Sequence, residues 1–237
     1  MEKVQVFLNG EQKEVVVRTG EAEKIVHPKA INLVGILAAP FQFYEGKKEH
    51  CPADKCHLQI KKDSGEIKLV ILDTDPHSTT TITGSLKKDG FFDSWGINTE
   101  ERWTVSEFLK HIKMQRTFFA VKDECDQLVD SLQKWNAKVE TVIKQHNDNA
   151  GNSLSMLERK VSEIGLKTKF NLSIPIFQGY AKQTFTVEIG FDPKNTQVDL
   201  YLFSNELFEL EITHRESLIE SELLSFKDFD CSKVVLS

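Results

Sequence analysis

Several signals that identify common classes of protein are missing or sparse in this sequence. Its 237 residues include four cysteines, too few and too scattered for the disulfide framework of a secreted protein. No stretch reaches the roughly 18 uncharged apolar residues of a membrane span. The longest apolar stretch, Ala30 to Phe43, is interrupted by Asn32 and predicts a buried helix. Residues 1–7 alternate polar and apolar side chains, unlike a secretory signal, so we expect a cytoplasmic protein that is not inserted in a membrane.

The motifs of common catalytic sites are also missing. The sequence contains no phosphate-binding glycine loop, no His-Glu-x-x-His and no Gly-x-Ser-x-Gly. Its twelve glycines fall mostly in expected turns, which disfavours a glycine-lined cofactor site. We therefore expect a non-enzymatic function and no cofactor.

The excess of acidic over basic residues disfavours a generic polyanion binder. Thirty Lys and Arg against 36 Asp and Glu give a net charge of −6 and a pI near 5.7. A local cationic cluster nevertheless lies at Lys110, Lys113 and Arg116. Single-stranded nucleic acid binding needs such cations beside aromatic faces. The aromatic residues near the cluster in sequence are Trp95, Trp103, Phe118 and Phe119. The alternative is that helix C-termini favour cations and that the aromatics belong to the core.

The first 90 residues predict a small antiparallel sheet with one helix. Residues 4–17 form an expected hairpin around Asn9-Gly10. Further strands are expected over 56–62, 66–73 and 79–86. His27-Pro28 opens the expected helix, which Pro40 limits.

Residues 91–165 change to a helical period. Thr104 and Glu107 are spaced as a capping box at a helix start. A seam of apolar residues at the coiled-coil period follows for about three heptads. Its members are Val121, Cys125, Leu128, Leu132, Trp135, Val139 and Val142. The seam is interpreted either as an oligomerisation surface or as a stripe that packs on the chain's own sheet. A shorter helix is expected to end before Gly165.

Residues 166–237 return to a period of two. Alternating apolar residues over 170–176, 185–191 and 198–202 predict an antiparallel meander. Pro175 places its strand at an edge or at a bulge, because proline cannot donate to a ladder. Ser204 is the expected N-cap of a final helix, although residues 208–212 equally fit a fourth strand.

Together these patterns predict an α+β protein. Antiparallel sheets flank a long central amphipathic helix, and a helix closes the C-terminal meander. We divide the chain into a β-rich region with one helix over 1–90, a helical segment over 91–165, and the meander with its helix over 166–237.

Two clusters are candidate metal sites. His50, Cys51, Cys56 and His57 supply the four ligand types of a structural zinc, although neighbouring side chains in a strand diverge. Asp73, Asp75 and His77 suit a divalent cation with a histidine base. The alternatives are a polar loop with Cys56 partly buried, and ordinary turn chemistry.

The chain from Trp103 to Phe226 resembles the YfdQ-like family of bacteriophage and prophage proteins. The resemblance rests on Leu72-Asp73, on Trp103 with Glu107-Phe108, and above all on Phe170 to Gly179, with its pattern Phe-x-Leu-x-Ile-Pro-x-Phe-x-Gly. It implies an origin in a phage or prophage, and no established activity or catalytic residue.

The leading hypothesis is a non-enzymatic phage protein that binds a partner inside an infected or lysogenic bacterium, as a homo-oligomer. The partner is a host or defence protein, or the DNA machinery of the phage. The alternatives are a metal-dependent hydrolase or nuclease that uses Asp73, Asp75 and His77, and a structural component of the virion.

Overall fold

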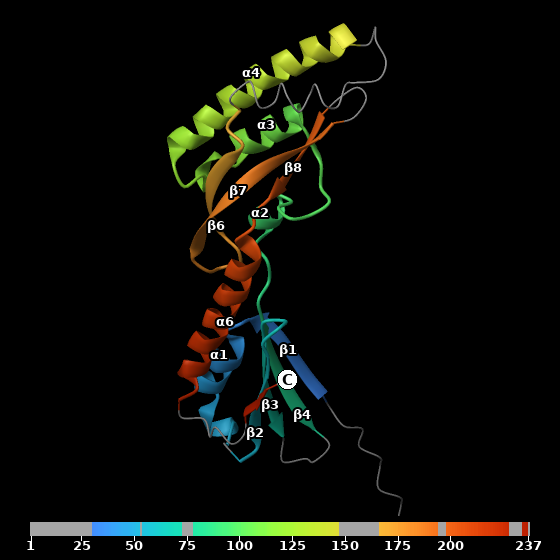
Figure 1. The fold of residues 1–237 in the computed structure, drawn as a ribbon. Helices are drawn as coiled ribbons and strands as arrows, with labels where there is room; N and C mark the ends of the chain where they lie inside the picture. The colour runs from blue at the N-terminus through green and yellow to red at the C-terminus, as the bar shows by residue number, and fades with distance from the viewer. Residues whose placement is uncertain are drawn as a thin grey trace, which may run out of the picture.

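Two β-sheets, each with its own hydrophobic core, organise the chain into two lobes that one helix connects (Figure 1). The computed structural model describes residues 30–52, 54–72, 78–146, 166–193, 198–227 and 234–236. It confirms the α+β class, with two sheets that are mostly antiparallel. The expected hairpin over 4–17 and the helix expected before Gly165 lie outside the described residues.

The first sheet has the order β1-β4-β3-β2-β9. Its strands are β1 (Ala30–Ile36), β2 (Cys56–Lys61), β3 (Glu66–Leu72), β4 (Thr79–Ser85) and β9 (Val234–Leu236). The three central strands are antiparallel neighbours, as their alternating sequences predict, whereas β1 and β9 pair in parallel at the two edges. The expected strands over 56–62, 66–73 and 79–86 are confirmed to within a residue.

The helix expected from His27-Pro28 is wrong, because residues 30–36 form β1. The helix α1 begins only at Ala39 and ends at Gly46, so Pro40 lies in its first turn, where proline loses no hydrogen bond. Gly84 of β4 allows this short helix to approach the sheet. A Cβ atom at Gly84 would lie 2.5 Å from the Leu37 carbonyl oxygen and 2.6 Å from Pro40 Cδ. The apolar content of this stretch thus reflects a strand followed by a packed turn.

The second sheet is fully antiparallel, in the order β5-β8-β7-β6. Its strands are β5 (Trp103–Thr104), β6 (Lys169–Pro175), β7 (Lys182–Pro193) and β8 (Val198–Phe203). The edge position expected from Pro175 is confirmed, because β6 is the last strand of the sheet. Alternate side chains of each strand point into one core, as the period of two predicts. Those of β6 are Phe170, Leu172 and Ile174, each with 0% exposure.

Helices α3 (Val105–Met114) and α4 (Lys122–His146) pack on this second sheet, and the short helix α2 (Gly90–Asp93) precedes them (Figure 1). Two single turns of 3-10 helix, Lys48–His50 and Arg116–Phe118, complete the described helices. The helical segment and the C-terminal strands therefore share one core, and do not form separate regions.

The seam along α4 faces the chain's own sheet. Cys125, Leu128, Leu132 and Trp135 are at most 1% exposed, and the Trp135 ring lies 5.2 Å from that of Phe191 in β7. The interpretation of these four residues as an oligomerisation surface is therefore wrong, because the sheet already covers them. Val121 is 55% exposed at the start of the seam, and the side chains of Val139 and Val142 lie outside the described ones.

Helix α6 (Leu207–Ser225) connects the lobes. Its first residue, Leu207, belongs to the core of the second sheet, whereas Ile219 belongs to the core of the first. The helical alternative for residues 208–212 is confirmed. Ser204 is not its N-cap, since that position is Glu206; instead Ser204 is buried, and its backbone hydrogen-bonds to the Asn98 side chain.

The packing of the seam predicts a clear difference between two of its residues. Leu132→Ala should lower the free energy of unfolding by about 2–5 kcal/mol, because it leaves a cavity in a closed core. Val121→Ala, at an exposed position of the same seam, should change it by less than about 0.5 kcal/mol. Urea unfolding followed by circular dichroism measures both. Equal changes in the free energy of unfolding for the two variants would contradict the burial of Leu132 and the exposure of Val121.

Candidate functional site

The start of α3 is fixed by the capping box that the sequence predicts. The Glu107 backbone N–H donates to Thr104 Oγ1 over 3.2 Å, and the Thr104 backbone N–H donates to Glu107 Oε2 over 3.0 Å. The Thr104 hydroxyl, which donates to Glu107 Oε2 over 2.7 Å, and next the Thr104 backbone N–H lower the pKa of Glu107, because both favour its charged form. Thr104 also belongs to β5, so the helix leaves the sheet at a fixed point.

The inner face of α3 belongs to the core. Phe108 and Ile112 have 0% exposure, and the His111 ring centroid lies 4.8 Å from those of both Trp95 and Trp103. Burial lowers the pKa of His111, because desolvation disfavours the charged imidazolium. His111 is therefore a packing residue that adds no positive charge at neutral pH.

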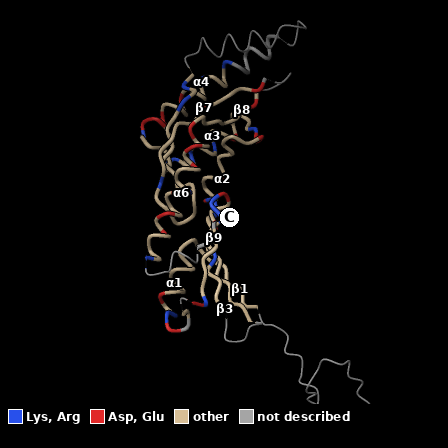
Figure 2. The backbone as a smooth tube through the Cα atoms, turned by 60° about the horizontal axis from the view of Figure 1, so that its bottom comes forward, with Lys and Arg blue, Asp and Glu red and all other residues tan. Residues whose placement is uncertain are grey.

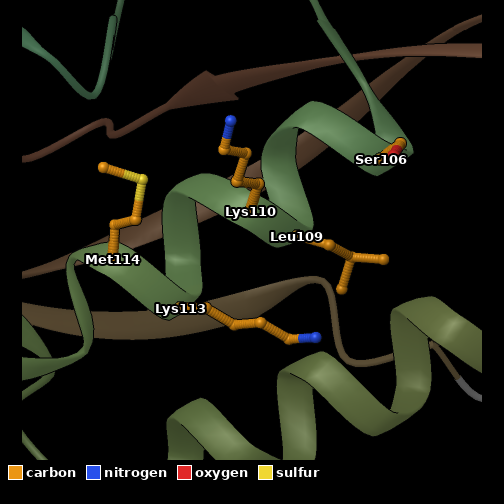
Figure 3. Close-up of a pocket in the computed structure, with 5 residues that line it drawn as sticks. All are labelled: Ser106, Leu109, Lys110, Lys113 and Met114. Atoms are coloured by element: carbon orange, nitrogen blue, oxygen red, sulfur yellow. The ribbon is translucent and has the colours of Figure 1, made fainter.

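The outer face of α3 carries a shallow depression of about 470 Å³ (Figure 3). Figure 3 shows Lys110 and Met114 extending from one side of the helix, and Leu109 and Lys113 from the other. Met114 is 71% exposed, whereas Leu109 packs partly against the core. The depression is lined by Ser106, Leu109, Lys110, Lys113 and Met114. This surface thus combines two ammonium groups with apolar contact area.

The structure separates the three cations of the predicted cluster. Lys110 and Lys113 line the same depression, and neither forms an ion pair within the described part of the chain. Arg116 lies in the following 3-10 turn and donates to Asp126 of α4 over 2.7 Å. The Arg116 charge is thus locally balanced, and only the two lysines remain available for a partner.

The aromatic faces that nucleic acid binding requires do not flank these lysines. Trp95 and Phe119 are buried in the core, and Trp103 packs on His111. Phe118 is partly buried, and the Lys182 ammonium and the Phe91 ring each lie 5.3 Å from its ring centre. Stacking of bases beside Lys110 and Lys113 is therefore disfavoured.

Of the proposed zinc ligands, the Cys51 and Cys56 side chains are joined by a hydrogen bond. Cys51 and Cys56 are 3% and 1% exposed, and burial raises the pKa of the Cys51 thiol, whereas zinc binds thiolate. His57 follows Cys56 in β2 and so faces the other side of the sheet, where its ring Nε2 lies 3.2 Å from Gln59 Nε2. The His50 side chain lies outside the described ones.

The second candidate metal cluster, Asp73, Asp75 and His77, also lies outside the described residues. Within the described ranges, no three His, Cys, Asp or Glu side chains group as metal ligands.

A second depression lies at the junction of the lobes. It has a volume of about 190 Å³, below the roughly 300–1,000 Å³ of ordinary ligand pockets. Burial, and next the charge of Glu222, raise the pKa of Tyr180 at its rim. The lining residues are Gly35, Ile36, Ser85, Lys87, Gln178 and Tyr180. Sequence reasoning missed this site because its residues come from three distant segments.

Sequence reasoning also missed three lining residues of the α3 depression, Ser106, Leu109 and Met114, as parts of a site. The signal was available in the helical period. Because Phe108 and Ile112 face inward, residues 106, 110, 113 and 114 lie on the opposite side of the helix.

Comparison of the chain with protein-family models, with curated proteins and with solved structures gives no match. In the described ranges, every helix is too short or too polar to cross a membrane.

The burial of His111 predicts a pH dependence of stability. In the unfolded chain its imidazole takes up a proton near its ordinary pKa of 6.5, but in the folded chain only at lower pH. The unfolded state thus binds more protons below pH 6.5, so the free energy of unfolding should fall as the pH drops through that value. Burial lowers the pKa of His214 as well, which adds to the fall.

Urea unfolding at pH values from about 5 to about 8 measures this dependence. His111→Gln should make it shallower, because the substituted side chain cannot titrate. Ser106→Gln, at an exposed position of the same helix, is the control and should preserve the wild-type slope, because neither side chain titrates. If the free energy of unfolding of His111→Gln varied with pH as steeply as that of the wild type, His111 would not contribute to the pH dependence.

Proposed function

We propose that the protein acts by binding another protein, and that the partner presents an acidic, partly apolar segment to the outer face of α3. The observation that supports this most is the pair Lys110 and Lys113, which frames a depression beside the exposed Met114. Carboxylates of a partner would pair with the two ammonium groups, and its apolar side chains would contact Met114 and the lysine stems.

The chemistry of these side chains suits a protein segment. Methionine is unbranched and polarizable, so it adapts to side chains of different shapes. The two lysines are held one turn apart on a helix whose start is fixed by its capping box. A partner helix with acidic residues at a spacing of three or four would match them.

The net charge of the chain selects a short acidic segment over a long polyanion. A nucleic acid backbone presents many phosphates, most of which would face a chain of net charge −6. A protein segment needs only a few carboxylates at the two lysines. The open shape of the depression also favours a macromolecular partner, because small-molecule sites enclose most of their ligand.

The resemblance to phage and prophage proteins supports a place for this binding in an infected or lysogenic bacterial cell. The partner in this proposal is a host or defence protein, or a component of the DNA machinery of the phage. Helix α4 and the strands of the second sheet serve as the scaffold that holds α3. The protein itself is proposed to have no catalytic role.

Fluorescence anisotropy tests this proposal with a labelled amphipathic peptide of repeated Glu-Glu-Leu-Leu. Lys110→Glu with Lys113→Glu should weaken its binding at least about tenfold, or about 1.4 kcal/mol. The matched control is Lys47→Glu with Lys62→Glu, which changes the charge equally at exposed positions of the first lobe and should retain wild-type affinity.

An equal loss in both double variants would indicate a general charge effect and contradict the site. A single-stranded oligonucleotide is the second probe. Tighter binding of the oligonucleotide than of the peptide, removed by the α3 substitutions, would instead support the nucleic acid interpretation. No binding of the peptide by the parent chain would contradict the proposed partner chemistry.

A further inference from the structure

In the described part of the chain the two sheets have four edge strands. Of these, β1 alone lacks a feature that prevents pairing with a further strand. Strand β5 has two residues and β9 has three, too short to template another strand. Strand β6 carries Pro175, and its Asn171 is covered, since the Asn171 carbonyl accepts from the Ala120 N–H over 3.0 Å and its N–H donates to Glu124 over 3.0 Å. Strand β1 has seven residues, with no proline and no charge.

The β1 backbone is held in a regular strand that presents its outer edge. All seven residues pair with β4 in an unbroken parallel register, from Ala30 opposite Thr79 to Ile36 opposite Ser85. Within the described residues no strand lies on its other side (Figure 1). Figure 2 shows β1 without acidic or basic residues. Such an edge offers a row of hydrogen-bonding groups to an incoming strand.

Apolar side chains of β1 remain exposed on both faces of the sheet. Val34 is 72% exposed and Ile36 is 60% exposed on one face, and Ile31 is 52% exposed and Leu33 is 44% exposed on the other. An incoming strand must therefore be apolar on both faces to cover them. A strand with the usual alternation of polar and apolar residues would cover one face only.

We propose that β1 pairs antiparallel with β1 of a second copy of the chain, around a two-fold axis at Leu33, to join two sheets into one. A second copy supplies a strand that is apolar on both faces. Because β1 carries no charge, the two-fold pairing brings no like charges together.

The sequence of β1 fits this register. Full overlap of the seven residues places Leu33 opposite its own copy, Asn32 opposite Val34, Ile31 opposite Gly35 and Ala30 opposite Ile36. The larger residues of the last two pairs thus face the small Gly35 and Ala30. The pairing involves the first lobe, whereas α3 belongs to the second, so both α3 surfaces of the dimer remain accessible (Figure 1). This proposal is independent of the one for α3.

Light scattering after size exclusion, at loading concentrations from about 1 μM to about 100 μM, measures the assembly. The parent chain should approach twice its monomer mass of 27.1 kDa as concentration rises. Val34→Lys should remain at the monomer mass with an unchanged circular dichroism spectrum, because the lysine is tolerated on an exposed monomer edge but not beside the second strand. Val235→Lys, at an exposed position of the opposite edge strand, is the matched control and should dimerise like the parent.

Cysteine cross-linking tests the register without relying on a charge. Under mild oxidation Leu33→Cys should give a covalent dimer, because the Cα atoms of opposite residues lie about 4.5–5.5 Å apart, within the range that a disulfide spans. Asn32→Cys should give much less, since it faces Val34. The parent chain is the control for the native cysteines, of which Cys51, Cys56 and Cys125 are buried.

Three results would overturn the proposal. The first is a parent chain that remains monomeric at every concentration tested, which would mean that the β1 edge is unpaired or pairs with another part of its own chain. The second is a dimer that Val34→Lys leaves intact. The third is a Leu33→Cys chain that forms no more covalent dimer than the parent.

Discussion

The packing of α3 and α4 on the second sheet determines most of the surface that this protein presents. The core between them contains Trp95, Phe108, Trp135 and Phe170, each with 0% exposure. Because this core takes the inner faces of both helices, it fixes which residues of α3 remain outside. The core removes Cys125, Leu128, Leu132 and Trp135 of the α4 seam from the surface and leaves Lys110, Lys113 and Met114 on it.

Charge and burial together decide which of the polar side chains near α3 are available to a partner. Arg116 is paired with Asp126, and burial keeps His111 neutral at physiological pH. The two remaining lysines lie on a chain with an excess of acidic residues. Local attraction within a repulsive overall field favours a small, specific acidic partner, because each additional contact with a long polyanion would be unfavourable.

The two lobes separate two kinds of surface. Helix α6 has one end in each core and thereby connects them, while the exposed apolar edge of β1 and the cationic face of α3 belong to different sheets. If both proposals hold, a dimer joined through β1 presents two α3 surfaces, and binding to a partner with two acidic segments would gain from effective concentration.

Local sequence determined the elements whose signals are complete within a few residues. The capping box of Thr104 and Glu107, the alternation in β2, β3, β4 and β6, and the edge position of Pro175 all depend on neighbouring positions, so the sequence alone predicted them. Only the tertiary structure decided that residues 30–36 form a strand, because an apolar run fits a strand or a helix until its partner β4 is known. It also decided that the seam from Cys125 to Trp135 is internal, since an apolar stripe requires a covering surface but its periodicity does not specify whether that surface belongs to the same chain.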